Sequence, residues 1–256
     1  MSYLGYIYNL IFYQPLFNAL VWLYNTMPGH DIGLAIAALT ILIRVILFPL
    51  YYKSIKSQRA LQQIQPKIDA LRKQYKDNQE KMAKELMTLY KTENVNPFSS
   101  CLPLLIQLPF LIALYQVFIH GLNSQSMEML YYFVSNPGTI NTISLGFFDL
   151  LKPNIILAFL AGAAQFWQSK MMITKKPPLI KGKEIAGSSD EKMTAIMNKQ
   201  IVYFMPIFTV IIGISMPAGL TLYWFLTTLL MALQQVWMFK KQRNDEPLNL
   251  NNELPE

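Results

Sequence analysis

Residues 32–52 read IGLAIAALTILIRVILFPLYY, an apolar run that is long enough to cross a bilayer yet contains Arg44. A guanidinium near the middle of a membrane costs roughly 2.5 to 17 kcal/mol, and arginine does not lose its proton to avoid this cost. None of the other predicted spans carries an acidic residue in its middle. This pattern favours a water-lined functional cavity around Arg44. The alternative is an arginine that reaches the nearby interface or neutralises a structural carboxylate.

The composition is that of an integral membrane protein, with 53% hydrophobic and only 14% charged residues over 256 positions. A crossing needs roughly 17 to 25 mostly apolar residues. This criterion predicts an all-α membrane protein with five transmembrane helices, at residues 32–52, 98–119, about 153–169, 201–216 and 218–239. The last two are separated only by Met216-Pro217-Ala218-Gly219 and are expected to form a tight antiparallel hairpin.

Lysine and arginine residues predict the orientation of these spans. Of the 22 basic residues, 20 fall in the segments 53–97, 170–200 and 240–256. The positive-inside rule makes these segments cytoplasmic, which places the N-terminus outside and the C-terminus inside. The net charge of +7 follows from this distribution, so it does not indicate a specific nucleic-acid partner. A basic cytoplasmic face does favour contact with anionic membrane lipids.

The first 25 residues are mostly apolar and aromatic, with a few polar side chains among them. Gln14, Asn18 and Asn25 fall on one helical face, and no basic segment or small-residue cleavage site marks a signal peptide. We expect an amphipathic helix that lies on the outer membrane surface within residues 1–30. The alternative is a sixth span, which would place the N-terminus inside without a basic residue to hold it there.

The basic segment 53–97 shows the periodicity of two amphipathic helices. Asp77-Asn78 divides them, and Pro66 must break or kink the first. The apolar stripe is most simply the seam of an antiparallel helical hairpin; the alternative is contact of the seam or its tip with the membrane surface or substrate. The resulting division is a surface helix (1–30), a first span (31–52), a cytoplasmic hairpin (53–97), four further spans (98–239) with a cytoplasmic loop (170–200), and a cytoplasmic tail (240–256).

Five motifs stand in order along residues 40–238. They are Arg44-Val-Ile-Leu-Phe-Pro49-Leu50; Gln65-Pro66-Lys67-Ile68; Leu89-Tyr90-Lys91 with Val95-Asn96-Pro97; Cys101-Leu-Pro103 to Gln107-Leu-Pro109; and Pro217-Ala-Gly219 to Tyr223-Trp224 with Gln234-Gln235. As a set they resemble the motifs of the bacterial YidC/Oxa/Alb membrane protein insertases. Ser99-Ser100 depart from the glycines that commonly precede the family's cysteine, and the tail is short and ends acidic.

The resemblance implies an insertase or chaperone of the bacterial inner membrane, with a hydrophilic groove open to the cytoplasm and to lipid. Thr40, Arg44 and Tyr223 match its substrate-proximal positions, and Gln65, Pro66 and Lys67 match the start of its cytoplasmic hairpin. Helical spacing puts Thr40 and Arg44 on one face of the first span. The predicted groove residues are therefore Thr40, Arg44, Gln107, Tyr223, Thr227 and Gln234. Ordinary interhelical hydrogen bonding is the alternative reading of Tyr223 and the glutamines.

A groove of this kind would shorten the distance over which a substrate's polar groups lose water, and Arg44 would attract acidic or polar residues. Partition of the substrate's apolar segment into lipid drives release, so no nucleotide or other cofactor is expected. Gly182-Lys183 indeed lacks the remainder of a phosphate-binding loop. The expected partners are nascent membrane proteins and lipids. Participation of a Sec translocon or a ribosome, and a monomeric state, are left open.

Two other classes of membrane protein could bury an arginine. A small transporter or channel would be expected to show paired inverted repeats or a second intramembrane charge, and neither is evident. An intramembrane hydrolase needs a nucleophile and a base at mid-depth, whereas His30 and His120 are both predicted near the outer surface. We therefore expect no catalytic residue and no metal site.

Overall fold

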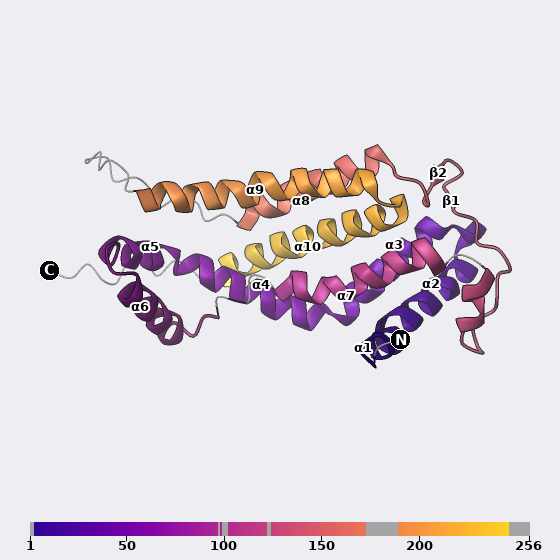
Figure 1. Cartoon of the computed structure of the whole chain (residues 1–256), viewed down its shortest axis with the longest axis horizontal. Helices are drawn as coiled ribbons and strands as arrows, with labels where there is room; N and C mark the ends of the chain where they lie inside the picture. Colours follow the sequence, from indigo (N-terminus) through magenta and orange to yellow (C-terminus); the bar gives the residue numbers. More distant parts are fainter. Residues whose placement is uncertain (1–2, 97, 99–101, 122–123, 173–188, 246–256) are drawn as a thin grey trace.

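The structure is a computed structural model that describes residues 3–96, 98, 102–121, 124–172 and 189–245. It is an elongated bundle in which most helices run along the long axis (Figure 1). The hairpin of α5 and α6 lies at one end, and the N-terminal helices and the β1–β2 hairpin lie at the other. Residues 65–92 and the β1–β2 hairpin are therefore at opposite ends of the molecule.

Helices account for most of the described chain. The helical elements are α1 (Tyr3–Tyr8), η1 (Asn9–Tyr13), α2 (Gln14–Thr26), η2 (Pro28–His30), α3 (Ile32–Ile46), α4 (Phe48–Gln63), α5 (Gln65–Gln74), α6 (Gln79–Thr92), α7 (Leu102–Gln116), η4 (Val117–Gly121), η5 (Ser124–Met129), α8 (Ile155–Met172), α9 (Ser189–Ser215) and α10 (Ala218–Asp245). The strands β1 (Ile143–Ser144) and β2 (Phe148–Asp149) pair antiparallel.

The predicted first span, 32–52, is not one straight helix. Helix α3 ends at Ile46 and α4 begins at Phe48, with a bend of 68° between them. Pro49 lies in the first turn of α4, where its missing N–H is tolerated and its ring prevents the helix from continuing unbent from α3. Leu47 is the break itself, at φ −88° and ψ 3°.

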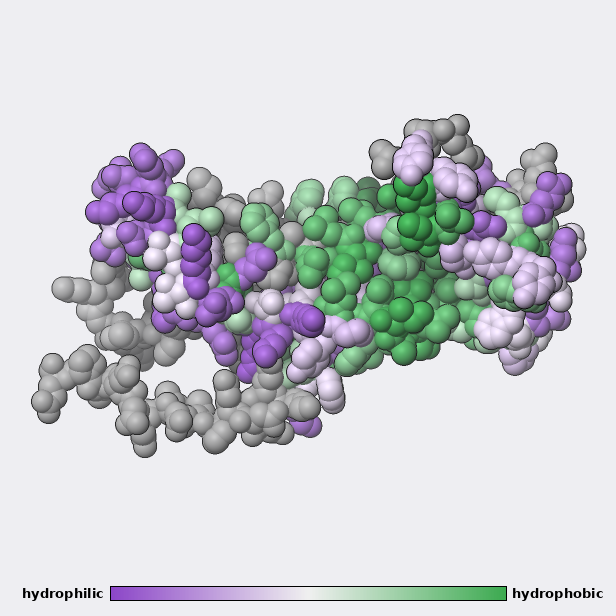
Figure 2. Space-filling view, turned by 90° about the horizontal axis from the view of Figure 1, so that it is seen from below, coloured by the Kyte–Doolittle hydropathy of each residue, from purple (hydrophilic) through white to green (hydrophobic). Residues whose placement is uncertain are grey.

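Among the described residues, length and apolar composition single out Ala218–Lys240 within α10 as able to cross a membrane, with α3 and α4 together as a second candidate if their bent pair is one span. Leu105–His120 and Val202–Ser215 are shorter apolar helices. On the face shown in Figure 2, hydrophobic residues gather over the middle of the molecule and hydrophilic residues at the end formed by α5 and α6. The number of spans accordingly stays a prediction.

Helices α5 and α6 form the hairpin of the segment 53–97. Helix α4 ends at Gln63, and Pro66 lies in the first turn of α5. The side chain of Asn78 caps α6 by accepting a hydrogen bond from the Lys81 N–H at 2.9 Å. Buried Ile64, Ile68 and Val95 form a small separate core with partly buried residues of α4 and α6. Lys67 pairs with Glu93 at 2.6 Å across the hairpin, and Gln65 donates to Asp69 at 3.0 Å.

The polar side chains of α2 hydrogen-bond to a distant loop, an interaction that the helical periodicity did not predict. Gln14 and Asn18 donate to the carbonyl of Met129, and Asn25 donates to that of Ser135. Asn18 also accepts a hydrogen bond from the Tyr131 N–H at 2.6 Å. The loop after η5 covers these side chains because its own main-chain groups need partners. The apolar side chains Tyr3, Tyr6, Leu10, Ile11 and Trp22 are exposed along the N-terminal helices.

Helix α8 packs against both α9 and α10. Helix α9 ends at Ser215 and α10 begins at Ala218, so the connection is as short as predicted. A Cβ at Gly213 would lie 3.0 Å from the Cβ of Ala158, so the small residue permits close approach of α8 and α9. The carbonyls of Lys152 and Leu150 accept from the N–H groups of Ala218 and Gly219, which satisfies the first turn of α10.

Candidate functional site

Arg44 lies in the last turn of α3 with only 6% of its surface exposed. Its Nη2 donates a 2.5 Å hydrogen bond to the main-chain carbonyl of Thr227 on α10. Among the described residues, no carboxylate forms an ion pair with it; the ion pairs found there, Lys67 with Glu93 and Lys152 with Asp149, lie in the hairpin and in the loop before α8. A permanent charge is thus buried without a counter-ion.

The aromatic ring of Tyr51 lies against this charge. The guanidinium carbon of Arg44 is 4.2 Å from the centre of the ring, and Tyr51 is only 1% exposed. A cation over an aromatic face is stabilised by about 2 kcal/mol or more where both are out of water. The bend at Leu47 lies between the two residues, so the ring on α4 contacts a charge on α3.

A chain of polar contacts continues from Tyr51 into two other helices. The Tyr51 hydroxyl donates to Gln107 Oε1 on α7 at 3.2 Å. Gln107 Nε2 in turn donates to the hydroxyl of Tyr223 on α10. Tyr223 is almost fully buried, and Gln107 is half-buried. The result is a polar connection between α4, α7 and α10 inside an otherwise apolar bundle.

A pocket of about 660 Å³ lies beside Arg44 between α3, the start of α4 and α10. It is lined by Ile41, Arg44, Val45, Phe48, Leu230, Leu233, Gln234 and Trp237. Six of these eight side chains are apolar, and several of them are also exposed on the surface of the bundle. The pocket is therefore not the uniformly hydrophilic groove of the prediction: its polar groups are two side chains set in an apolar wall.

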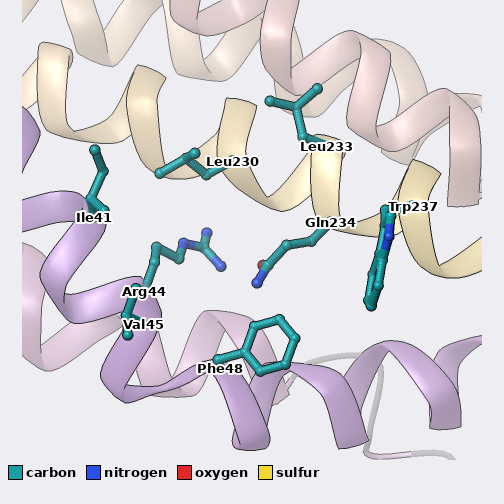
Figure 3. Close-up of a pocket in the computed structure, with 8 residues that line it drawn as sticks. All are labelled: Ile41, Arg44, Val45, Phe48, Leu230, Leu233, Gln234 and Trp237. Carbon is teal, nitrogen blue, oxygen red and sulfur yellow. The ribbon is translucent and has the colours of Figure 1, made fainter.

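Figure 3 shows the Arg44 guanidinium and the Gln234 amide pointing toward one another across the pocket. Arg44 Nε and Nη1, and Gln234 Oε1, are buried and have no hydrogen-bond partner among the described residues. A buried donor or acceptor left without a partner costs about 1 to 3 kcal/mol, and more when it is charged. These facing donors and acceptor form a place where water or a polar ligand group would be stabilised.

The six predicted groove residues take different positions. Arg44 and Gln234 line the pocket, Thr227 supplies its main-chain carbonyl, and Gln107 and Tyr223 belong to the buried polar chain. Thr40 is 1% exposed, and its hydroxyl donates to the Ile36 carbonyl of its own helix at 2.7 Å. Thr40 is absent from the pocket lining, and its hydroxyl is already hydrogen-bonded within α3.

Tyr51 is the site residue that sequence reasoning missed. An aromatic residue seven positions after Arg44 lies two helical turns away on the same face of a helix, so this spacing could have identified Tyr51. Pro49 and the bend lie between the two residues. The hairpin residues Gln65, Pro66 and Lys67 lie beyond α4, away from this site.

The sequence is similar to one family model and to several known proteins. The family model described as 60Kd inner membrane protein matches residues 22–245. Three relatives carry the name membrane protein insertase YidC. That of Fusobacterium nucleatum is 31% identical over 93% of this chain and 99% of its own length, and that of Clostridium tetani is 34% identical over 88% of each. That of Syntrophobacter fumaroxidans is 32% identical over 88% of this chain, which spans 37% of that longer protein.

Proposed function

The chain belongs to the 60Kd inner membrane protein family, the YidC/Oxa/Alb insertases of the bacterial inner membrane, and on this basis we propose that it inserts nascent proteins into the bilayer at the Arg44 pocket. No step of the proposed reaction uses a nucleotide or another cofactor. The matching family model and the insertase names of its relatives support this activity. The buried, uncompensated charge of Arg44 supports the site.

The chemistry of the pocket suits a substrate that is partly polar. A polar segment that leaves water loses hydrogen bonds, at about 1 to 3 kcal/mol for each unpaired group. The free N–H groups of Arg44 and the free oxygen of Gln234 would replace some of these bonds. A substrate carboxylate 4 Å from the guanidinium would gain about 4 kcal/mol at an effective dielectric constant near 20. Acidic and polar segments are therefore the preferred cargo.

The apolar part of the wall serves the other half of the substrate. Ile41, Val45 and Trp237 line the pocket and are each more than half exposed at the surface. An apolar substrate segment can therefore contact the pocket and lipid at the same time. Its transfer into lipid is favourable by roughly 25 cal/mol per Å² of apolar surface removed from water. This gain supplies the driving force that the proposed mechanism needs.

The proposed topology has five spans, with the hairpin of α5 and α6 in the cytoplasm and the β1–β2 loop outside. The opposite placement of these two regions along the long axis supports it. The basic residues of 175–183 and the tail 246–256, which the prediction places in the cytoplasm, lie outside the described residues. The proposed partners are nascent membrane proteins and the surrounding lipids.

Reconstitution into liposomes tests this function. The full chain would be presented with a one-span substrate whose translocated tail is acidic, and insertion would be followed by protection of that tail from protease. We expect the wild type to insert the substrate and Arg44→Ala to lose at least tenfold in rate. Arg59→Ala is the matched control, because Arg59 stacks on Phe239 away from the pocket, and it should insert normally. Absence of insertion by the wild type would contradict the proposal.

A further inference from the structure

We propose that Tyr51 is a positioning residue for Arg44: its ring takes the place of a counter-ion and holds the guanidinium with its free N–H groups toward the pocket. This inference deepens the proposed function, because it names the residue that makes the Arg44 charge available to a substrate. It rests on geometry, and the position of the guanidinium can be measured without any insertion activity.

Two contacts hold the guanidinium, and they come from different helices. The ring of Tyr51 on α4 lies 4.2 Å from its central carbon, and the Thr227 carbonyl on α10 accepts from Nη2. Nε and Nη1 keep their protons free, and the picture of the pocket shows the group directed at Gln234 (Figure 3). Tyr51 does not line the pocket, so its ring contacts the charge without occupying the space that a substrate would use.

An aromatic ring stabilises a cation differently from a carboxylate. A carboxylate would neutralise the charge and would occupy the donors of the guanidinium in a bidentate pair. The ring face stabilises the charge through its quadrupole and accepts no N–H proton in the guanidinium plane. Arg44 therefore stays positive toward a substrate while part of its burial cost is offset. This combination suits a charge that must attract a substrate group and then release it.

The position of the ring is itself determined by neighbouring residues. Pro49 and the break at Leu47 orient the first turns of α4, and the Tyr51 hydroxyl is anchored to Gln107 on α7. The side chain is fully buried, so its rotamer is restricted by packing as well. Tyr51→Phe removes the anchoring hydroxyl but keeps the ring, whereas Tyr51→Leu removes the ring from a similar volume. These two variants separate the contributions.

The first experiment measures the guanidinium directly. The chain contains four arginines, so the side-chain resonances of 15N-labelled Arg44 can be assigned by comparison with Arg44→Lys in detergent micelles or nanodiscs. We expect the ring of Tyr51 to shift these resonances, the shift to persist in Tyr51→Phe, and the shift to disappear in Tyr51→Leu. Resonances that are the same in Tyr51→Leu and the wild type would overturn the proposal, whether or not the chain inserts proteins.

The second experiment measures the consequence for insertion. Two one-span substrates would differ only in the charge of the translocated tail, acidic or neutral, in the liposome assay described above. A desolvated contact of about 2 kcal/mol corresponds to roughly a thirtyfold change. We therefore expect Tyr51→Leu to lose between tenfold and thirtyfold in its preference for the acidic tail, and Tyr51→Phe to retain the preference within about threefold.

Phe17→Leu is the matched control, because Phe17 is fully buried in the main core and does not belong to the pocket or its polar chain. It should keep the preference for the acidic tail even if it lowers stability, which thermal unfolding would report for every variant. An unchanged preference in Tyr51→Leu would overturn the proposal. Equal loss in Tyr51→Phe and Tyr51→Leu would also overturn it, since the hydroxyl rather than the ring would then hold Arg44.

Discussion

The main-chain carbonyl of Thr227 on α10 accepts a hydrogen bond of 2.5 Å from Arg44 Nη2 on α3. A main-chain acceptor is present whatever side chain position 227 carries, provided that the helix is intact. The contact between α3 and α10 at this level therefore depends on Arg44 and not on the threonine hydroxyl. The sequence grouped Arg44 and Thr227 together as groove-lining residues, but only Arg44 contributes its side chain to this contact.

The first prediction concerns Thr227. Thr227→Val removes the hydroxyl at nearly constant shape and keeps the carbonyl, so we expect insertion within about twofold of the wild type and a change in unfolding free energy below about 1 kcal/mol. Protease protection of the reconstituted substrate measures the first quantity, and thermal unfolding in detergent measures the second. A loss as large as that of Arg44→Ala would show that the side chain itself acts on the substrate.

The second prediction concerns the start of α10. A Cβ at Gly219 would overlap the ring of Phe118, which is buried in η4. Overpacking of this kind costs about 1 to 3 kcal/mol, so Gly219→Ala should lower the melting temperature. Phe118→Leu makes room, and the double variant should therefore be less destabilised than the sum of the two single variants. Strict additivity in this double-mutant cycle would contradict the packing argument.

Local chemistry accounts for much of what the sequence could predict. The ordered motifs identified the family, which the family model confirms, and the burial of Arg44 followed from its place in an apolar run. The start of α6 could also be predicted, because asparagine is a preferred N-cap residue and Asn78 occupies that position.

The remaining features depend on long-range packing, which periodicity does not report. Gln14, Asn18 and Asn25 look suited to water, but they bind a loop more than 100 positions away in the chain. Thr40 shares a face with Arg44, but its hydroxyl bonds within its own helix. Tyr51 contacts Arg44 across a 68° bend between α3 and α4. Polar residues on one face predict that a polar partner exists, and the identity of that partner is settled by the fold.

The third prediction concerns the hairpin. Ile68 is 2% exposed in the small core between α5 and α6, whereas its neighbour Lys67 forms an exposed ion pair with Glu93. Ile68→Ala should cost about 2 to 4 kcal/mol of local stability, and Lys67→Ala less than about 1 kcal/mol. Hydrogen exchange of the α5 and α6 amides measures both. Equal protection in the two variants would mean that the apolar seam does not hold the hairpin together.

The fourth prediction concerns pH. Partial burial raises the pKa of Asp31, but hydrogen bonds from the N–H groups of Leu145, Leu34 and Gly33 and from the Ser144 hydroxyl outweigh this effect, so the pKa lies below its ordinary value. A lowered folded-state pKa stabilises the fold above the unfolded-state pKa of about 3.9, and this contribution is lost as the pH falls through the folded-state value.

Thermal unfolding at a series of pH values tests this linkage. The wild type should lose stability below about pH 4. Asp31→Asn should be less stable at neutral pH by about 2 kcal/mol, because hydrogen bonds to the neutral amide are weaker than those to the charged carboxylate. Its stability should also change less between pH 5 and pH 3 than that of the wild type. Parallel curves for the two proteins would show that Asp31 does not couple the β1–β2 hairpin to α3.

The fifth prediction concerns the contact between α2 and the loop after η5. Asn18 is 2% exposed, donates to the Met129 carbonyl at 3.0 Å and accepts from the Tyr131 N–H at 2.6 Å. Asn18→Leu keeps the approximate volume but leaves the Tyr131 N–H without its acceptor, whereas the Met129 carbonyl keeps the hydrogen bond from Gln14. At about 1 to 3 kcal/mol for an unpaired buried group, the variant should lose about 1 to 3 kcal/mol of stability.

Asn25 offers a matched comparison on the same face of the same helix. Its hydrogen bond to the Ser135 carbonyl, at 2.7 Å, is exposed, so water can replace the side chain when Asn25→Leu removes it. Asn25→Leu should therefore cost less than about 1 kcal/mol, and the Tyr131 amide should keep its protection from hydrogen exchange. In Asn18→Leu that protection should fall at least tenfold, since the amide loses its acceptor. Comparable stability and equal protection in the two variants would show that water, rather than the loop, solvates the polar face of the N-terminal helix.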